Sequence, residues 1–272
     1  MEKAYELLKT YFGYDSFKKG QEELISHILS GEDCVGVMPT GAGKSICYQI
    51  PALVFSGTTI VISPLISLMK DQVDTLQEIG ISATYINSSL TNSDYLQTIE
   101  NAILGMYKII YVAPERLNSD SFLRLLNSID ISMIAIDEAH CVSQWGHDFR
   151  PSYTEIANVI LNLNKRPIIT AFTATATEIV KNDIINLLKL SNPFVLTTGF
   201  DRENLSFHVV SGDDRKRYVY RYLRQQTNTS GIIYCSTRKN VDALYEDLLE
   251  IGHKVSKYHG GMNDKERNKN QD

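Results

Sequence analysis

Cysteine is scarce in this sequence, and positive charge is not in excess. The four cysteines lie far apart and form no Cys-x-x-Cys pair. This spacing argues against a zinc site and against a disulfide framework, so a reducing compartment fits best. The formal net charge of −5 provides no general basic field for holding nucleic acid. Any contact with DNA or RNA must therefore be local.

Long apolar runs are missing as well. No apolar stretch approaches the ~20 residues that a membrane-spanning helix needs, and residues 1–9 favour an amphipathic helix over a signal peptide. At 272 residues and 43% hydrophobic, the chain can form one large core or two smaller ones. We therefore expect a cytoplasmic protein with no membrane partner.

A glycine-rich turn at residues 38–45, Met-Pro-Thr-Gly-Ala-Gly-Lys-Ser, lies between a short apolar run and a helical pattern. Gly41 and Gly43 can adopt backbone angles closed to other residues, so that successive N–H groups point at phosphate oxygens. Lys44 would place its charge at the β- and γ-phosphates, and Ser45 would offer a hydroxyl to Mg²⁺. An ordinary glycine turn is the alternative, but it would not need the strand and the helix on either side. The pattern predicts an ATP site formed by Pro39, Thr40, Gly41, Ala42, Gly43, Lys44 and Ser45.

The residues around this loop refine the prediction. Met38 stands where the GTPase form of the loop has glycine, which favours the form used by helicase-like ATPases. Upstream, the Gln21 amide offers a donor and an acceptor side by side, as the edge of adenine requires, and Tyr14 could stack on the base. A glutamine at a helix start is more often only solvated. Its position just before the loop favours the adenine interpretation.

Short apolar runs alternate with helical patterns through the first 200 residues. The runs are rich in Ile and Val and show little polar alternation, which is typical of strands covered on both faces. This order predicts an α/β fold with a parallel, helix-covered sheet of the RecA type. The predicted strands after the loop are 59–62, 83–86, 108–112, 133–136, 168–172 and 194–196.

Two adjacent carboxylates follow one of these strands directly, in the sequence Asp137-Glu138-Ala139-His140. A buried strand with acidic residues at its tip can supply a Mg²⁺ partner, Asp137, and a base that orients or deprotonates water, Glu138. Acidic residues at a strand end can also serve only for solvation. The phosphate-type loop upstream favours the chemical role.

An aromatic-rich segment follows the carboxylates. Trp145, the only tryptophan, and Phe149 sit among polar residues, which is not a core pattern. Bases that stack on such rings gain about 1 to 3 kcal/mol each, and Arg150 could pair with phosphate or stack. The alternative is a loop folded onto its own sheet with Trp145 as an anchor. The candidate contacts in this segment are Gln144, Trp145, His147, Phe149 and Arg150.

Taken together, these segments resemble a RecQ-type DNA helicase of superfamily 2. The stretch from Asp137 to Pro151 is more specific than the glycine-rich loop, which many ATPases share. Lys18 falls at a nucleotide-contacting position of the family, where arginine is usual. The matching segments are 17–21, 38–52, 63–72, 112–117, 137–151, 171–177, 200–204, 233–235 and 258–262.

The resemblance implies nucleic-acid contacts outside the aromatic segment. Turns after strand ends would hold the phosphate backbone of single-stranded DNA, and Thr173 and Thr175 would couple two lobes. Ordinary helix capping is the alternative for the turns, and Thr175-Ala-Thr-Glu178 is also a capping-box pattern. The turn residues concerned are Pro64, Ser67 and Arg116.

The resemblance also implies an activity, namely ATP-dependent 3′ to 5′ movement along single-stranded or partly duplex DNA in recombination and repair. Mg²⁺ and ATP are the implied cofactors. Repair proteins and single-strand-binding proteins are the implied partners of a full-length protein, which would be nucleoid-associated in a bacterium.

The domain organisation is expected to follow the same family. Residues 1–205 would form the first RecA-like lobe, and residues 206–272 the N-terminal part of an incomplete second lobe. In that second part we predict strands at 207–210, 232–235 and 254–258 and helices at 213–224 and 241–251. The arginine motif that faces the γ-phosphate in the family has no counterpart here, so we expect Mg·ATP binding with poor hydrolysis.

The sequence alone is also compatible with two other functions. An RNA-unwinding DEAD-box-like ATPase would share the loop and the carboxylates, but His140 in place of Asp and the segment 145–150 count against it. A non-catalytic module that binds ATP and DNA would account for the missing arginine motif.

Overall fold

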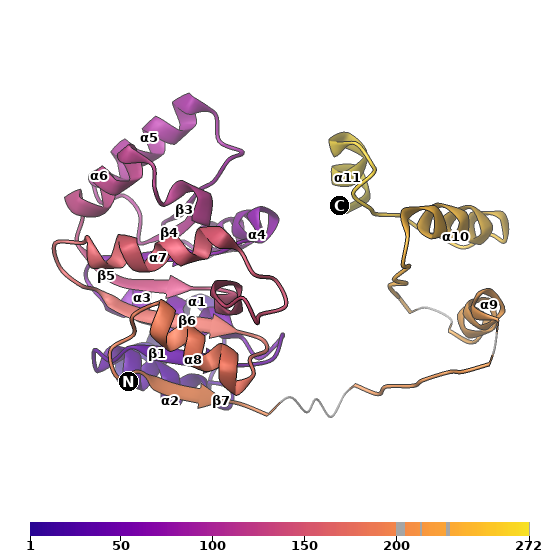
Figure 1. The fold of residues 1–272 in the computed structure, drawn as a ribbon, viewed down its shortest axis with the longest axis horizontal. Coiled ribbons are helices and arrows are strands. Elements are labelled where there is room, and N and C mark those ends of the chain that lie inside the picture. Colours follow the sequence, from indigo (N-terminus) through magenta and orange to yellow (C-terminus); the bar gives the residue numbers. More distant parts are fainter. Residues whose placement is uncertain (200–204, 213, 227–228, 272) are drawn as a thin grey trace. The chain divides into compact units, whose positions relative to one another are not determined.

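The computed structural model describes residues 1–199, 205–212, 214–226 and 229–271. Contacts between Cα atoms divide the chain into two compact units, Met1–Glu203 and Asn204–Asp272 (Figure 1). The first unit contains all the candidate site residues.

The first unit is built on a seven-stranded sheet in which all neighbouring strands are parallel, in the order β3-β4-β2-β5-β6-β1-β7. Six strands lie at the predicted positions within one or two residues, and the apolar run before the glycine-rich loop forms β1. The prediction of a parallel RecA-like sheet is therefore confirmed. The strands are β1 Cys34–Val37, β2 Thr58–Ile62, β3 Ala83–Ile86, β4 Ile109–Val112, β5 Ile131–Ile136, β6 Ile168–Thr173 and β7 Phe194–Thr197.

Helices cover both faces of this sheet. One apolar core joins the sheet to α2, α3 and α4, the other joins it to α5, α6, α7 and α8, and α1 packs outside α2 and α3. Burial on both faces explains why the strands show no polar alternation. The helices are α1 Glu2–Phe12, α2 Gln21–Leu29, α3 Lys44–Val54, α4 Ile66–Glu78, α5 Asn92–Ile103, α6 Asp120–Ser128, α7 Pro151–Leu161 and α8 Glu178–Leu187, with 3₁₀ turns η1 Pro114–Arg116 and η2 Ala139–Val142.

The second unit corrects part of the prediction. Its helices are α9 Arg215–Gln225, α10 Arg238–Glu250 and α11 Asp264–Gln271, and the first two match the predicted helices. The predicted strands at 207–210, 232–235 and 254–258 are wrong, because these segments pair with no strand in the described part of the chain. Apolar composition gives a preference for extended backbone, but a strand also needs a neighbour for its N–H and C=O groups.

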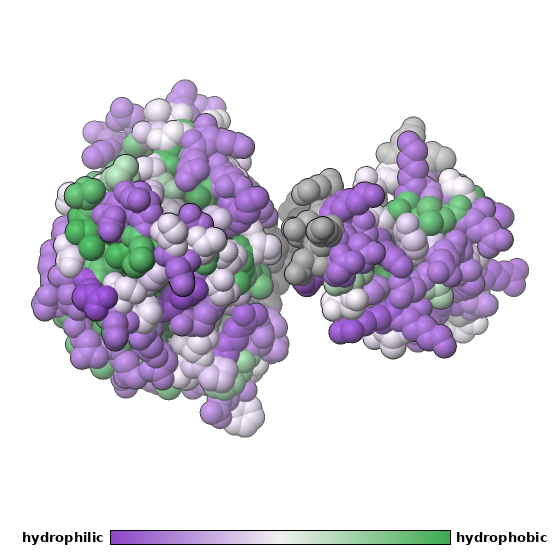
Figure 2. Space-filling view, turned by 90° about the horizontal axis from the view of Figure 1, so that it is seen from above, coloured by the Kyte–Doolittle hydropathy of each residue, from purple (hydrophilic) through white to green (hydrophobic). Residues whose placement is uncertain are grey.

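The surface of both units is largely hydrophilic on the face shown in Figure 2, with smaller apolar areas. Within the described ranges, no helix has both the length and the hydrophobicity needed to cross a membrane.

Candidate nucleotide and nucleic-acid site

The candidate site residues gather at one edge of the sheet. The glycine-rich loop follows β1, Pro64 follows β2, Arg116 closes η1 after β4, Asp137 follows β5, and Thr173 ends β6. Parallel strands point their carboxyl ends the same way, so segments far apart in the sequence meet at this edge, where ligands bind in open α/β sheets. Figure 1 shows β5, β6 and β1 side by side in this sheet.

The glycine-rich loop has the predicted backbone. Gly41 has a φ of 85° and Gly43 a φ of 78°, both in the left-handed region, and α3 begins at Lys44. The Lys44 amine donates a hydrogen bond to the Met38 carbonyl at 3.2 Å. The positive charge is thereby held inside the curve of the loop, and it also acts on the Asp137 and Glu138 carboxyls.

Gln21 lies against this loop. It is buried, and its Nε2 donates to the carbonyls of Ala42 at 3.1 Å and Gly43 at 3.0 Å. Its Oε1 accepts from the Lys18 N–H at 2.8 Å. A Cβ at position 43 would lie 2.4 Å from Nε2, so a side chain there would displace the Gln21 amide and would also strain the positive φ. This amide therefore holds the loop in place.

The other predicted adenine contacts lie close to the loop or on the surface. The Lys18 amine donates to the Gly41 carbonyl at 3.1 Å, and Tyr14 is 56% exposed. An exposed ring of this kind can stack on a base. Contact of adenine with Gln21, Tyr14 and Lys18 stays a prediction.

The two carboxylates behave differently because their surroundings differ. Burial raises the pKa of Asp137 to about 6, and the neighbouring Glu138 charge adds to the effect. A contact to the His140 ring, 3.2 Å from Nδ1 to Oε2, lowers the pKa of Glu138. Glu138 has a φ of 48°, a conformation that a residue with a side chain rarely adopts and that is often found at functional sites. Asp137 can thus bind a cation in its ionised form, and Glu138 remains ionised at neutral pH.

The donor set suits magnesium. The Ser45 hydroxyl and the Asp137 carboxylate are oxygen ligands of the kind that Mg²⁺ prefers. Lys44 acts on Asp137 electrostatically, and the buried Tyr48 hydroxyl lies near both Ser45 and Asp137. The residues present therefore fit a Mg·nucleotide.

Magnesium-dependent nucleotide binding is expected to weaken below about pH 6. Because Asp137 has a raised pKa, the carboxyl holds a proton below this pH, and Mg²⁺ must displace that proton. Each further pH unit should lower the Mg²⁺ contribution to nucleotide affinity by about tenfold. Titrations at about pH 5 to 8, with and without Mg²⁺, measure this. Asp137→Asn should remove the Mg²⁺ contribution and its pH dependence, whereas an undiminished contribution at pH 5 would contradict the assignment of Asp137.

His140 joins the carboxylates to two other candidate segments. Its Nδ1 lies 2.8 Å from the Thr173 hydroxyl oxygen at the end of β6. Its ring stacks on that of His147, with 4.0 Å between centroids and 19° between planes. The Thr173 hydroxyl in turn donates to the Thr175 carbonyl at 3.1 Å. Contacts through His140 therefore join three segments. These are the turn that carries Asp137 and Glu138 (the carboxylate turn), the end of β6 and the aromatic segment.

The capping alternative for Thr175 is wrong. Thr177 is the N-cap of α8, and its side chain accepts from the Val180 N–H at 3.3 Å. Glu178 pairs with Lys181 instead of closing a capping box. The helix begins two residues later than that pattern predicts, which leaves the Thr173 and Thr175 segment in the site.

The aromatic segment leaves its tryptophan free. Trp145 is 77% exposed, so the alternative in which it anchors the loop is wrong. The Ser143 hydroxyl anchors the loop instead, donating to Asp183 at 2.6 Å, and a Cβ at Gly146 would lie 2.2 Å from the His140 carbonyl oxygen. Phe149 is also exposed. Two aromatic rings are thus available to ligands.

Arg150 differs from expectation. Its guanidinium donates to Asp148 through Nε at 3.0 Å and Nη2 at 2.9 Å, and to the Pro64 carbonyl through Nη1 at 2.9 Å. It holds the aromatic segment to the turn after β2. The sequence suggested contact with phosphate, but it contained no sign of these partners.

A pocket of about 520 Å³ connects the segments. It takes residues from the glycine-rich loop, the turn after β2, the carboxylate turn, the aromatic segment and the β6 end. Its lining comprises Thr40, Pro64, Leu65, Glu138, His140, His147, Asp148, Ala174 and Thr175.

Further polar groups lie at the same edge, after β2, β3, β4 and β5. Ser67 and Gln144 are exposed, and the Arg116 guanidinium lies 5.4 Å from the centre of the Tyr95 ring. Asn87, after β3, was not predicted. It is buried, its Oδ1 accepts from Ser89, and its Nδ2 has no hydrogen-bond partner among the described residues. A polar Asn-Ser-Ser stretch directly after a strand was the available signal.

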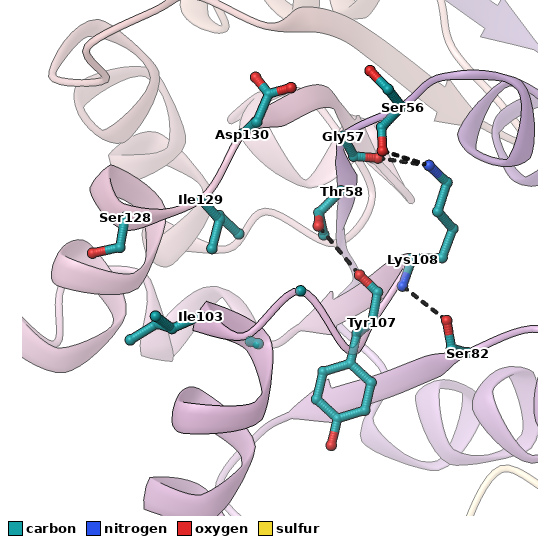
Figure 3. Close-up of a pocket in the computed structure, with 12 residues that line it drawn as sticks. Ser56, Gly57, Thr58, Ser82, Ile103, Tyr107, Lys108, Ser128, Ile129 and Asp130 are labelled. Atoms are coloured by element: carbon teal, nitrogen blue, oxygen red, sulfur yellow. Dashed lines mark hydrogen bonds between the residues drawn. The ribbon is translucent and has the colours of Figure 1, made fainter.

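A separate pocket of about 330 Å³ lies at the amino ends of the strands (Figure 3). The Lys108 amine donates to the carbonyls of Ser56 at 3.1 Å and Gly57 at 2.9 Å, and burial lowers its pKa. Its donors are used to hold the chain between α3 and β2. This pocket contains none of the predicted site residues.

Comparisons with known proteins identify the family of this chain. Residues 18–182 match the DEAD/DEAH box helicase family. The ATP-dependent DNA helicase RecQ of Bacillus subtilis is 48% identical over 273 residues, covering 100% of this chain and 46% of that protein. RecQ of Haemophilus influenzae is 46% identical over 259 residues, covering 95% of this chain and 42% of that protein. The chain therefore spans less than half the length of these relatives.

A solved structure shows the same fold. The crystal structure of the DUF1998 helicase MrfA bound to DNA has a TM-score of 0.73 at 19% identity, covering 99% of this chain and 42% of that chain. The predicted similarity to RecQ-type helicases is confirmed by the curated relatives. The family match extends over more than half of the sequence and includes the glycine-rich loop and both carboxylates. This chain belongs to the DEAD/DEAH box helicase family.

Proposed function

We propose that this chain is the ATP-binding and DNA-binding part of a RecQ-type DNA helicase. The observation that carries the proposal is the contact between the carboxylate turn and the exposed aromatic segment, made through the stacked rings of His140 and His147. A nucleotide bound at the carboxylate turn would thus lie near His140, and a nucleic acid bound at the aromatic segment would lie near His147, whose ring stacks on that of His140.

The nucleotide half of the proposal follows from the loop and the carboxylates. The loop N–H groups and Lys44 would hold the phosphates, and Ser45 and Asp137 would hold Mg²⁺. Bound Mg²⁺ would neutralise phosphate charge. Glu138, ionised at neutral pH, would orient the attacking water and accept its proton, and the His140 contact keeps its carboxylate in place.

The proposed DNA binding depends mainly on exposed aromatic rings and on only a few charged side chains. Trp145 and Phe149 would stack on bases. Ser67 and Arg116 would contact the backbone, and these contacts are local, as the net charge of −5 requires. If DNA binding shifts the aromatic segment, His147 would press on His140. Because His140 contacts Glu138, this shift would change the position of the Glu138 carboxylate.

For the whole protein we propose ATP-dependent 3′ to 5′ movement along single-stranded or partly duplex DNA, in recombination and repair. The names of the bacterial RecQ relatives support this substrate. We propose residues 1–205 as the first motor lobe and residues 206–272 as part of the second. Repair and single-strand-binding proteins are the proposed partners, and the nucleoid-containing cytoplasm the proposed location.

Trp145→Ala is expected to lower affinity for single-stranded DNA by about 5- to 150-fold, because a stacked base is worth about 1 to 3 kcal/mol. Phe149→Ala should act in the same direction. Fluorescence anisotropy with a labelled oligothymidylate measures both. Leu104→Ala removes an apolar side chain that is equally exposed but lies after α5, outside the predicted site, and should have no effect.

The same titration separates the rival functions. An RNA oligonucleotide of matched sequence should bind more weakly than DNA, and tighter RNA binding would favour the RNA helicase alternative. Unchanged DNA affinity in both aromatic variants would contradict the proposed DNA surface.

A further inference from the structure

A line of polar side chains crosses the apolar core between the sheet and helices α3 and α4. Tyr48 and Gln49 lie on α3, Tyr111 on β4 and Gln72 on α4. Gln49 is only 4% exposed and the two tyrosines 1%, among apolar neighbours that include Met69. Polar groups in such surroundings destabilise a protein unless they are hydrogen-bonded, so their partners must be accounted for.

Gln49 is hydrogen-bonded to Gln72 and Tyr111, and Tyr48 lies close to Tyr111. The Gln49 Nε2 donates to the Gln72 Oε1 at 3.1 Å and to the Tyr111 hydroxyl at 3.1 Å. The Tyr48 hydroxyl interacts with the side chains of Tyr111 and Ser45. Burial raises the pKa of Tyr111 to about 12, so the phenol remains a neutral hydrogen-bonding group. The resulting polar line runs Gln72, Gln49, Tyr111, Tyr48, Ser45.

The two ends of this polar line lie in functional segments. Ser45 follows the glycine-rich loop and is the candidate Mg²⁺ ligand. Gln72 is on α4, whose first turn carries Ser67 and follows Pro64 in the candidate DNA site. Because a helix moves nearly as a rigid body, a displacement of the first turn would be carried to Gln72.

An apolar core of the same volume would pack at least as well as these amides and hydroxyls. What directional hydrogen bonds add is a fixed arrangement of α4 relative to α3. A shift of Gln72 would change the Gln49 bonds and, through Tyr111 and Tyr48, the environment of the Ser45 hydroxyl.

We propose that Gln72, Gln49 and Tyr111 are positioning residues that couple occupancy of the DNA site to affinity for Mg·nucleotide. This inference rests on the proposed function. Coupling is reciprocal, so DNA should change nucleotide affinity by the same factor as nucleotide changes DNA affinity. The factor expected for such coupling is about 5- to 150-fold.

The test is the affinity for a fluorescent, non-hydrolysable Mg·ATP analogue, measured with and without an oligothymidylate of about 15 nucleotides. The ratio of the two affinities is the coupling factor. Gln72→Leu and Tyr111→Phe should each bring this factor close to one, and the double variant should do no more than either single one. Gln72→Glu should retain coupling, because a carboxylate can still accept the Gln49 N–H bond.

Two matched controls should keep the full factor. Gln77 is also on α4, but its amide donates to the Ala83 carbonyl at 2.8 Å, so Gln77→Leu leaves the polar line intact. Tyr107→Phe removes a hydroxyl that accepts from Asn101 at 3.3 Å, far from the site. A purely structural role would lower nucleotide affinity equally with and without DNA and leave the ratio unchanged.

Unchanged coupling in both Gln72→Leu and Tyr111→Phe would overturn the inference and leave the proposed function standing. If the unmodified chain binds neither ligand, the proposed function fails along with the inference. If it binds both without any coupling, only the inference fails.

Discussion

Lys44→Ala should lower affinity for Mg·ATP by about 100-fold while leaving the fold intact. The Lys44 amine is a positive charge held at the phosphate loop, and a hydrogen bond to a charged group is worth about 1.5 to 3 kcal/mol. Among the described residues the amine donates to the Met38 carbonyl, and in the variant a water molecule can donate to that carbonyl instead. Isothermal titration with Mg·ATP measures the loss, and circular dichroism checks the fold.

The matched control is Lys70→Ala. Lys70 lies on α4 in an exposed pair with Asp74, 3.8 Å apart, and pairs of this kind contribute little. Its removal should leave nucleotide affinity within about twofold. Equal affinities of Lys44→Ala and the unmodified chain would show that ATP binds somewhere other than the glycine-rich loop.

Asp33→Ala should destabilise the first unit by about 3 to 5 kcal/mol, because it leaves two backbone N–H groups without their acceptor, at about 1 to 3 kcal/mol each, and breaks a half-exposed ion pair. Asp33 precedes β1, and its side chain is only 2% exposed. It accepts from the N–H groups of Ile169 at 2.9 Å and Ser191 at 2.7 Å and pairs with the Arg166 guanidinium. Alanine would leave two backbone donors and a cation without their acceptor.

Chemical denaturation should detect this loss, and the melting temperature should fall by about 10 °C for a unit of this size. Asp130→Ala is the control. Asp130 forms an exposed pair with Lys165 at 3.7 Å, and its loss should change stability by less than about 0.5 kcal/mol. A comparable loss in both variants would contradict the role given to the buried Asp33 contacts.

Local patterns predicted the first unit because most of its strands are buried on both faces. The glycine-rich loop between a strand and a helix also has few other interpretations. The strands predicted at 207–210, 232–235 and 254–258 failed, because strand formation depends on neighbours that composition does not specify. The four-residue segment 83–86 shows no stronger local signal, yet it forms β3 because β4 lies beside it.

Side-chain partners at the site were the least predictable part. The sequence identified Gln21 and Arg150 as polar residues near ligands, but their bonds to the loop carbonyls and to Pro64 depend on distances set by the whole fold. No sequence motif marks Asp33, and its three partners are far away in sequence. Trp145 could be interpreted in two ways until its exposure was seen.

The central claim is that one edge of the first unit binds Mg·ATP and single-stranded DNA together. A crystal structure of the chain with a non-hydrolysable Mg·ATP analogue and an oligothymidylate tests it most directly. We predict phosphates on the N–H groups of residues 41–45, Mg²⁺ on Ser45 and Asp137, and a base stacked on Trp145. A nucleotide bound outside the glycine-rich loop, or DNA bound on another face of this unit, would contradict the account.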